Sequence, residues 1–144
     1  MKQILGIGNA LVDALVKIDN DFIINELSLS KDGMTLIDEA TYQKMLQRLE
    51  GFDIEQSTGG SAGNALLAVA CLGGTATFIG KRGRDSNGKF YARERGAQGV
   101  QPIALYDEEL PTGVATTFVM PDGQRTFATY LGASATMRAD ELRE

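Results

Sequence analysis

Residues 59–74 read Gly-Gly-Ser-Ala-Gly-Asn-Ala-Leu-Leu-Ala-Val-Ala-Cys-Leu-Gly-Gly. This pattern predicts a helix that opens on a double glycine and has a body of small or apolar residues. Its polar groups gather at the start, where unpaired backbone N–H groups and the positive end of the helix dipole favour oxygen-rich ligands. The candidate binding residues here are Gly59, Gly60, Ser61 and Asn64.

A purely structural interpretation of the same stretch is also open. Gly59 and Gly60 would then permit an unusual turn, and Gly63 would allow a close contact between helix and sheet. Asn64 would cap neighbouring backbone. Glycine-rich junctions between a strand and a helix also occur without ligands, so the rest of the chain has to decide between the two interpretations.

Length and composition restrict the classes of function. The chain has 144 residues, 43% of them hydrophobic, which fits one domain or a compact part of a larger one. Its 14 Lys and Arg residues against 19 Asp and Glu give a net charge of −5, with no block of like charge. This balance argues against nucleic-acid or anionic-membrane binding. The lack of histidine excludes Ser-His-Asp and Cys-His catalysis and histidine-ligated metal sites.

The N-terminus and the single cysteine indicate the compartment. Residues 2–6 contain no apolar region of a signal peptide, and no later segment approaches the length that spans a membrane. We therefore expect a cytoplasmic protein. Cys71 is the only cysteine, so the chain cannot form an internal disulfide. Its place in the apolar helix predicts a buried, inert thiol.

Short apolar runs alternate with helical patterns along most of the chain. Such alternation predicts an α/β fold with a parallel sheet and helices on its faces, in which ligands bind beyond the carboxyl ends of the strands. The predicted strands cover residues 4–7, 34–37, 75–79 and 100–105, and the first strand is expected to be buried. The predicted helices cover residues 19–27, the stretch after a cap at Asp38, residues 59–74 and residues 86–97.

Residues 112–131 depart from this alternation and predict a β-hairpin. Residues 114–120 form a strand pattern in which threonines and an aromatic residue fall on alternating faces, Pro121–Gln124 form a turn signal, and a second strand pattern covers 125–131. The two long strands suit a small sheet that stands off the main layer as a flap or an interface. A plain edge hairpin is the alternative.

Two glycine-rich stretches approach nucleotide-binding motifs without completing them. Gly6–Leu11 begins like a dinucleotide fingerprint, but Leu11 occupies the third glycine position and no clear helix follows. Gly83–Phe90 nearly spells a P-loop, but Phe90 stands where a Ser or Thr hydroxyl must hold magnesium. We therefore expect neither a Rossmann cofactor nor a P-loop nucleotide site.

Asn9 and Asp13 lie just past the first predicted strand, on either side of three apolar residues. A carboxylate accepts hydrogen bonds, and a carboxamide both accepts and donates them, so this pair could grip vicinal hydroxyls of a sugar. In the alternative interpretation, Asp13 is a solvated turn residue and Asn9 caps neighbouring backbone.

Together these motifs resemble the ribokinase-like (PfkB) family of carbohydrate and nucleoside kinases. Gly6–Asp13 is similar to the family's first strand, Gly59–Gly74 to its first signature, and Gly80–Gly88 to the following G-x-x-G-x-D-x-x-G turn. The resemblance covers essentially all of residues 1–144, but only the N-terminal portion of a family member. Residues 139–144 begin like a helix that stops before it can bury a face, so we expect a longer protein.

The resemblance implies an α/β sandwich whose parallel sheet carries a small β-sheet lid, formed by strands near residues 14–18, 33–38 and 112–131. In the family such lid strands often form a homodimer interface. Arg125 corresponds to a family arginine near the transferred phosphate, in agreement with the electrostatic needs of phosphoryl transfer. The implied acceptor pocket is lined by Asn9, Asp13, Gly59, Gly60, Ser61 and Asn64, with Phe127 and Thr129 covering it from the lid.

The chain also departs from the family pattern. Ser61 stands where ribokinases carry Lys, and Arg82 stands where the family usually has an apolar residue. The spacing of Asn9 and Asp13 is similar to that of adenosine kinases, which favours a nucleoside acceptor. The family's catalytic Asp, anion hole and ATP pocket would lie beyond Glu144. We therefore expect ATP and Mg²⁺ to be bound mainly outside this chain, with no metal site in it, and the chain alone to be inactive.

The resulting hypothesis is ATP-dependent phosphoryl transfer to the hydroxymethyl group of an adenosine-like nucleoside, with this chain supplying acceptor-binding residues and the lid. A free sugar of the ribose or fructose type is the second acceptor considered. The alternative from another class is a non-catalytic module that binds a ligand or dimerises.

Overall fold

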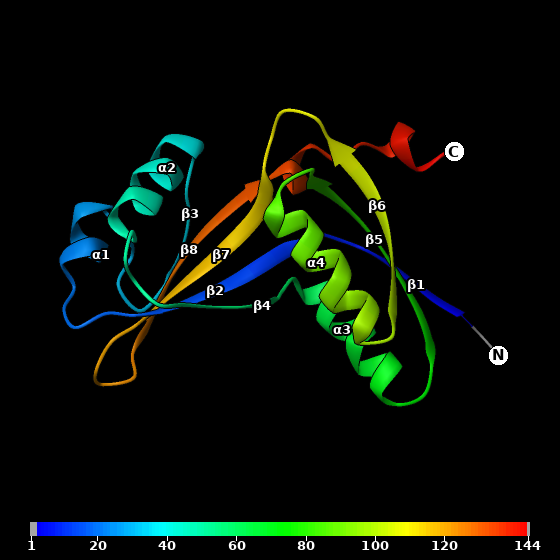
Figure 1. Cartoon of the computed structure of the whole chain (residues 1–144), viewed down its shortest axis with the longest axis horizontal. Helices are drawn as coiled ribbons and strands as arrows, with labels where there is room; N and C mark the ends of the chain where they lie inside the picture. The colour runs from blue at the N-terminus through cyan, green and yellow to red at the C-terminus, as the bar shows by residue number, and fades with distance from the viewer. Residues whose placement is uncertain (1–2, 144) are drawn as a thin grey trace. The chain divides into compact units, whose positions relative to one another are not determined.

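The computed structural model describes residues 3–143, which form two compact units. Unit 1 comprises Met1–Val12, Ser57–Gly113 and Leu131–Glu144, so it is built from three separate stretches of chain. Unit 2 comprises Asp13–Gln56 and Val114–Tyr130. Figure 1 shows the helices and strands that make up the two units.

Unit 1 is built on a three-stranded parallel sheet in the order β1-β5-β6, with β1 at Gln3–Ile7, β5 at Thr75–Gly83 and β6 at Val100–Asp107. Strand β5 pairs with both neighbours, and its pairing with β6 continues to Gly83, opposite Asp107. Helix α3 (Ser61–Cys71) follows β4 in the chain, and helix α4 (Ser86–Ala97) follows β5. Both helices pack against the three-stranded sheet, α3 mainly against β5 and β1 and α4 mainly against β6. The predicted α/β class and its parallel sheet are confirmed.

The burial of the first strand differs from the prediction. Ile4, Leu5 and Ile7 are 46%, 58% and 48% exposed, although an apolar strand of an α/β protein was expected to be buried. In the part of the chain that the structure describes, β1 is an edge strand, paired on one side only with β5. Its apolar side chains therefore lack the flanking strand that helps to cover those of a central strand.

Helix α3 approaches this sheet closely, but through glycines on the strand side. A Cβ atom on Gly6 would lie 2.7 Å from Leu66 Cδ1, and one on Gly8 would lie 2.8 Å from Ala62 Cβ. The prediction that Gly63 makes the contact between helix and sheet is wrong, because Gly63 faces helix α4. Cys71, expected to be buried, is exposed as the last residue of the helix.

Most of the second sheet belongs to unit 2. Its five strands are ordered β3-β8-β7-β2-β4. The predicted hairpin is confirmed: β7 and β8 are neighbours, and the Met120 N–H donates to the Gln124 carbonyl at 2.9 Å across the turn. The strand bounds are Leu11–Lys17 for β2, Met34–Leu36 for β3, Ile54–Thr58 for β4, Thr112–Val119 for β7 and Arg125–Gly132 for β8.

Two helices, α1 (Phe22–Glu26) and α2 (Glu39–Arg48), complete unit 2. As predicted, Asp38 caps α2, its carboxylate accepting from the Thr41 N–H at 2.8 Å. Tyr42 of α2 stacks on Tyr130 of β8, with ring centroids 4.5 Å apart and an interplanar angle of 11°. One face of the sheet is therefore the core face of this unit.

Local patterns predicted most element positions well. Helix α4 has the predicted bounds, whereas α1 is shorter than the predicted 19–27. The expected helix at 139–144 is a single 3₁₀ turn, η2, at Ala139–Leu142, preceded by another, η1, at Ala133–Thr136. Glu144 lies outside the described residues. Among the helices of residues 3–143, none combines the length and the apolar character needed to cross a bilayer.

Candidate functional site

The double glycine forms a sharp junction between β4 and α3. Gly60, the N-cap of α3, has φ 85° and ψ 125°, a conformation that favours glycine. The Gly59 N–H donates to the Leu11 carbonyl oxygen at 2.8 Å, and a Cβ atom on Gly60 would run into the carbonyl oxygen of Asn9. The unusual turn is therefore confirmed, and it needs glycine for both its backbone angle and its contact with Asn9.

A fully buried arginine holds this junction in place. Arg95, on α4, donates from Nη2 to the Gly59 carbonyl oxygen at 2.9 Å and to Asn64 Oδ1 at 2.6 Å. Its Nη1 donates to Gln98 Oε1 at 3.2 Å. Because a guanidinium only donates hydrogen bonds, it fixes Asn64 with the oxygen inward, which leaves the amide Nδ2 as the donor available to a ligand.

Sequence reasoning missed Arg95. An arginine in the last turn of a helix normally interacts with the helix dipole at the surface, so nothing in the local pattern indicated burial. The signal that bears on it is Gly63, where a Cβ atom would lie 2.8 Å from Tyr91 Oη and 2.9 Å from Arg95 Nη2. The absence of a side chain at position 63 gives the guanidinium its space.

Five of the predicted site residues meet in unit 1, around the start of α3. The Gly59 residue is buried, whereas the side chains of Asn9, Ser61 and Asn64 are exposed. The site thus combines a rigid backbone with exposed groups that donate and accept hydrogen bonds, an arrangement suited to sugar hydroxyls or other oxygen-rich groups.

The remaining predicted residues lie on the second sheet, in unit 2. Arg125, Phe127 and Thr129 alternate along β8 with Tyr130 and its neighbours on the core face, so they lie on the opposite face. Asp13 alternates with buried neighbours along β2 and belongs to the less buried face of its strand. Phe127 and Thr129 lie opposite Met34 and Leu36 of β3 in the register. Their role as a lid stays a prediction.

The aspartate of the G-x-x-G-x-D-x-x-G turn has a structural role. Asp85 is the N-cap of α4, and its Oδ1 accepts from the Gly88 N–H at 2.8 Å. The same carboxylate accepts from the Thr112 hydroxyl at 2.6 Å and from the Thr112 N–H at 2.8 Å. Asp85 therefore joins the start of α4 to the start of β7, all within unit 1.

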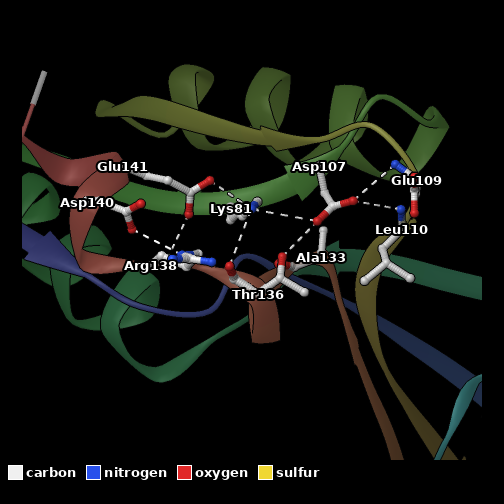
Figure 2. Close-up of polar contacts among 9 residues, drawn as sticks. All are labelled: Lys81, Asp107, Glu109, Leu110, Ala133, Thr136, Arg138, Asp140 and Glu141. Atoms are coloured by element: carbon white, nitrogen blue, oxygen red, sulfur yellow. Dashed lines mark hydrogen bonds and ion pairs between the residues drawn. The ribbon is translucent and has the colours of Figure 1, made fainter.

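A second group of charges, also missed from the sequence, lies near the carboxyl ends of β5 and β6 (Figure 2). Lys81 is buried, and its Nζ lies 2.8 Å from Glu141 Oε1, 3.3 Å from the Thr136 carbonyl oxygen and 3.7 Å from Asp107 Oδ2. Figure 2 shows the two carboxylates reaching the ammonium from different elements, β6 and η2. The group fastens η1 and η2 to the sheet.

The carboxylates of this group titrate below their ordinary range. Hydrogen bonds from the Leu110 N–H, the Thr136 hydroxyl and the Glu109 N–H lower the pKa of Asp107 to about 2, and the Lys81 charge adds to them. The hydrogen bond from Lys81 lowers the pKa of Glu141, and the same bond raises the pKa of Lys81. All three groups are therefore charged at neutral pH, and each satisfies another.

The described residues do not fit a metal site. Within residues 3–143 no three His, Cys, Asp or Glu side chains cluster closely enough to hold a metal ion. The Mg²⁺ ion of a kinase would thus find no acidic cluster in this part of the chain. The expectation that ATP and Mg²⁺ are bound mainly by other residues stays a prediction.

Comparison with known protein families matches residues 28–144 to the pfkB family carbohydrate kinases. The chain belongs to this family. Among curated pfkB relatives, probable fructokinase-3 of Arabidopsis thaliana is 38% identical over 90 residues, which are 60% of this chain and 26% of that protein. The chain thus spans about a quarter of this pfkB relative.

Solved pfkB-like structures match nearly the whole chain. The adenosine kinase of Anopheles gambiae, solved in complex with P1,P4-di(adenosine-5) tetraphosphate, has a TM-score of 0.87 at 27% identity and covers 97% of this chain and 42% of its own. The adenosine kinase of Sinorhizobium meliloti has a TM-score of 0.77 at 34% identity, covering 96% of this chain and 43% of its own. The fold of these kinases therefore covers nearly all of the chain.

Proposed function

We propose that this chain provides acceptor-binding residues of an ATP-dependent kinase that phosphorylates the hydroxymethyl group of an adenosine-like nucleoside. The observation that carries the proposal is the junction at the start of α3, where Arg95 holds the Gly59 carbonyl and Asn64 in fixed positions. A preorganised site loses little freedom when a polyhydroxylated ligand binds. Family membership supports the kinase activity.

In this proposal the site recognises the sugar part of the acceptor. The Asn64 amide donates to a hydroxyl oxygen, while Ser61 and the N–H groups of the first turn of α3 supply further donors. Asn9, whose backbone carbonyl oxygen lies against Gly60, adds an exposed carboxamide. Asp13, Arg125, Phe127 and Thr129 keep the roles implied by the family resemblance as predictions.

The extent of the similarities supports a nucleoside over a free sugar. In sequence, adenosine kinase 2 of Arabidopsis thaliana covers 98% of this chain, whereas probable fructokinase-2 and fructokinase-3 of the same plant cover 76% and 60% of it. A solved probable sugar kinase of Rhizobium etli also covers 96% of the chain. The fructokinase segment has the higher identity, 38%, so a free sugar of the ribose or fructose type is the second candidate. Both acceptors present hydroxyls to the same groups.

A parallel acceptor assay tests the proposal. The full-length protein that contains this chain is incubated with ATP and with adenosine, inosine, ribose or fructose, and phosphate transfer is measured for each. We expect adenosine to give the highest kcat/KM. A higher value for fructose or ribose would replace the nucleoside by a free sugar, and no transfer to any of the four would refute the kinase proposal.

A matched pair of variants connects the activity to the site. Asn64→Ala removes the amide donor, and we expect it to raise the KM for the acceptor about tenfold, the effect of one hydrogen bond in a buried complex. Ala65→Ser, at the next exposed position of α3, serves as the control and keeps the parent KM. An unchanged KM in folded Asn64→Ala would assign Asn64 to the scaffold.

We further propose a cytoplasmic location and a homodimer through the strands β2, β3, β7 and β8. The exposed side chains of Met34 and Leu36 on the edge strand β3 support the dimer, because such an edge offers both backbone groups and apolar surface. Sedimentation of the full-length protein tests it, with Met34→Lys expected to shift the protein toward the monomer. A monomeric parent protein would contradict the proposal.

A further inference from the structure

A cationic cavity lies in unit 1, apart from the residues assigned to the acceptor. It has a volume of about 640 Å³ and is lined by α4, the end of β5 and Tyr106 of β6. Four of its eight lining residues are basic and none is acidic. These four are Arg82, Arg84, Lys89 and Arg93. A pocket of this size accommodates a small organic molecule.

Arg82 provides a buried charge without a counter-charge. Its side chain is only 8% exposed, and its Nη1 and Nη2 donate to the Gly88 carbonyl oxygen and, at 3.1 Å, to the Tyr106 hydroxyl. Both partners are neutral, and no carboxylate among residues 3–143 forms an ion pair with this guanidinium. Buried charges in proteins are normally paired, so Arg82 is suited to an anion that comes from outside.

A second guanidinium converges on the same aromatic ring. Arg84 Cζ lies 4.2 Å from the centre of the Tyr106 ring, and Arg82 Cζ lies 5.3 Å from it. The ring attracts each cation, but the two like charges next to it repel each other. An anion bound between them would remove this repulsion.

Two acidic side chains form ion pairs with arginines of the cavity, but they compete only weakly with a ligand. Glu108 pairs with Arg84 at 2.9 Å, and Glu94 pairs with Arg93 at 2.9 Å. Glu108 and both arginines are more than half exposed, and exposed ion pairs contribute little free energy. A multiply charged anion can therefore take over these guanidinium groups.

We propose that this cavity binds a phosphate-bearing small molecule. Arg82 supplies the buried charge, Arg84 and Lys89 supply exposed donors, and the Tyr106 ring lies next to the anion. Guanidinium groups match phosphate oxygens in geometry and charge. Arg82 stands where the family resemblance predicts an apolar residue, so the site is a property of this chain. It is a second ligand site, separate from the acceptor residues at the start of α3.

Binding is measured by calorimetry on the purified protein, at low and at high salt, without nucleoside or ATP. Two probes, inorganic phosphate and phenyl phosphate, distinguish a free anion from a phosphate ester with an aromatic part. We expect saturable binding of one molecule per chain in at least one arm, weakened by salt. Absence of saturable binding in both arms would overturn the proposal, and it would leave the acceptor assay unaffected.

Variants assign the binding to the cavity. Arg84→Gln and Lys89→Gln change exposed side chains, and each is expected to weaken binding about tenfold, the effect of one charged hydrogen bond. Arg82→Leu is expected to abolish binding while the protein stays folded, because a leucine has no buried charge to desolvate. Lys31→Gln removes an exposed charge of unit 2 as the control. Equal weakening by Lys31→Gln, or full binding by folded Arg82→Leu, would refute the assignment.

Discussion

Arg95 Nη2 lies 2.6 Å from the side-chain oxygen of Asn64, and the same nitrogen lies 2.9 Å from the carbonyl oxygen of Gly59. One guanidinium thus connects α4 to both the glycine turn and the first turn of α3. Arginine suits this place because its planar group offers several donors in fixed directions. The shape of the candidate site therefore depends on a helix that contributes none of its ligand-binding groups.

Arg95→Met tests this connection. The methionine keeps the apolar stem, but the buried Gly59 carbonyl loses its donor, so we expect the free energy of unfolding to fall by about 1–3 kcal/mol. Urea unfolding measures the change. Arg93→Met, at an exposed position of the same helix, is the control and should change stability by less than about 0.5 kcal/mol. If Arg95→Met were as stable as the parent, the hydrogen bonds of Arg95 would contribute no more than the cost of desolvating its buried charge, which methionine avoids.

Gly63→Ala tests whether the lack of a side chain at position 63 provides the space that the Arg95 guanidinium occupies. The added methyl would lie 2.9 Å from Arg95 Nη2, and we expect a loss of about 1–3 kcal/mol from overpacking. In an Arg95→Met background the loss should be smaller, because methionine has no guanidinium nitrogen for the new methyl group to meet. A double-mutant cycle with urea unfolding measures the coupling. Strictly additive losses would contradict a direct contact.

Gly60→Ala and Gly51→Ala form a matched pair, because both glycines have φ 85°. Each alanine bears the cost of a left-handed backbone, about 1–2 kcal/mol. Only at Gly60 does the new methyl also meet a backbone oxygen, that of Asn9, whereas nothing lies within 4 Å at Gly51. We therefore expect Gly60→Ala to lower the thermal midpoint clearly more than Gly51→Ala. Equal shifts would mean that the turn relaxes freely.

The cluster of Lys81, Asp107 and Glu141 makes the free energy of unfolding fall at acid pH. The pKa of Asp107 is lowered from its ordinary 3.8 to about 2, so folding favours the charged carboxylate. Its contribution is complete above the ordinary value and is lost as the pH falls toward about 2. Between these values we expect the parent to lose more unfolding free energy than Asp107→Asn, measured by urea titration at each pH. Asp53→Asn, an exposed control, should follow the parent.

If Asp107→Asn loses stability with falling pH as steeply as the parent, the acid sensitivity arises from other carboxylates. Glu141, whose pKa is also lowered, is then the next residue to replace.

Local sequence patterns were sufficient for several of the elements. Helix α4 starts at a capping aspartate and ends just before glycine Gly99, and the β7–β8 hairpin follows from alternation around Pro121–Gln124. Hydrophobic period, caps and turn residues act within a few positions of the chain, so they can be recognised without a structure. The parallel sheet followed from the order of these elements.

Burial was harder to predict because it depends on neighbours that are distant in sequence. The apolar residues of β1 and the thiol of Cys71 looked buried, yet both are exposed at the edges of unit 1. Arg95 and Lys81, which no sequence pattern singled out, are both buried. Hydrophobicity describes a side chain, whereas exposure is decided by the segments that pack over it.

The candidate site shows the same division. The glycine turn, the polar start of α3 and the family resemblance could be recognised from the residues alone, because backbone freedom and motif spacing are properties of adjacent residues. The support of this turn by Arg95, 36 residues from Gly59, depends on the folded arrangement of α3 and α4. The same holds for the approach of Arg82 and Arg84 to Tyr106. Hydrogen bonds and charges act through space, and the fold sets which distant residues lie within their range.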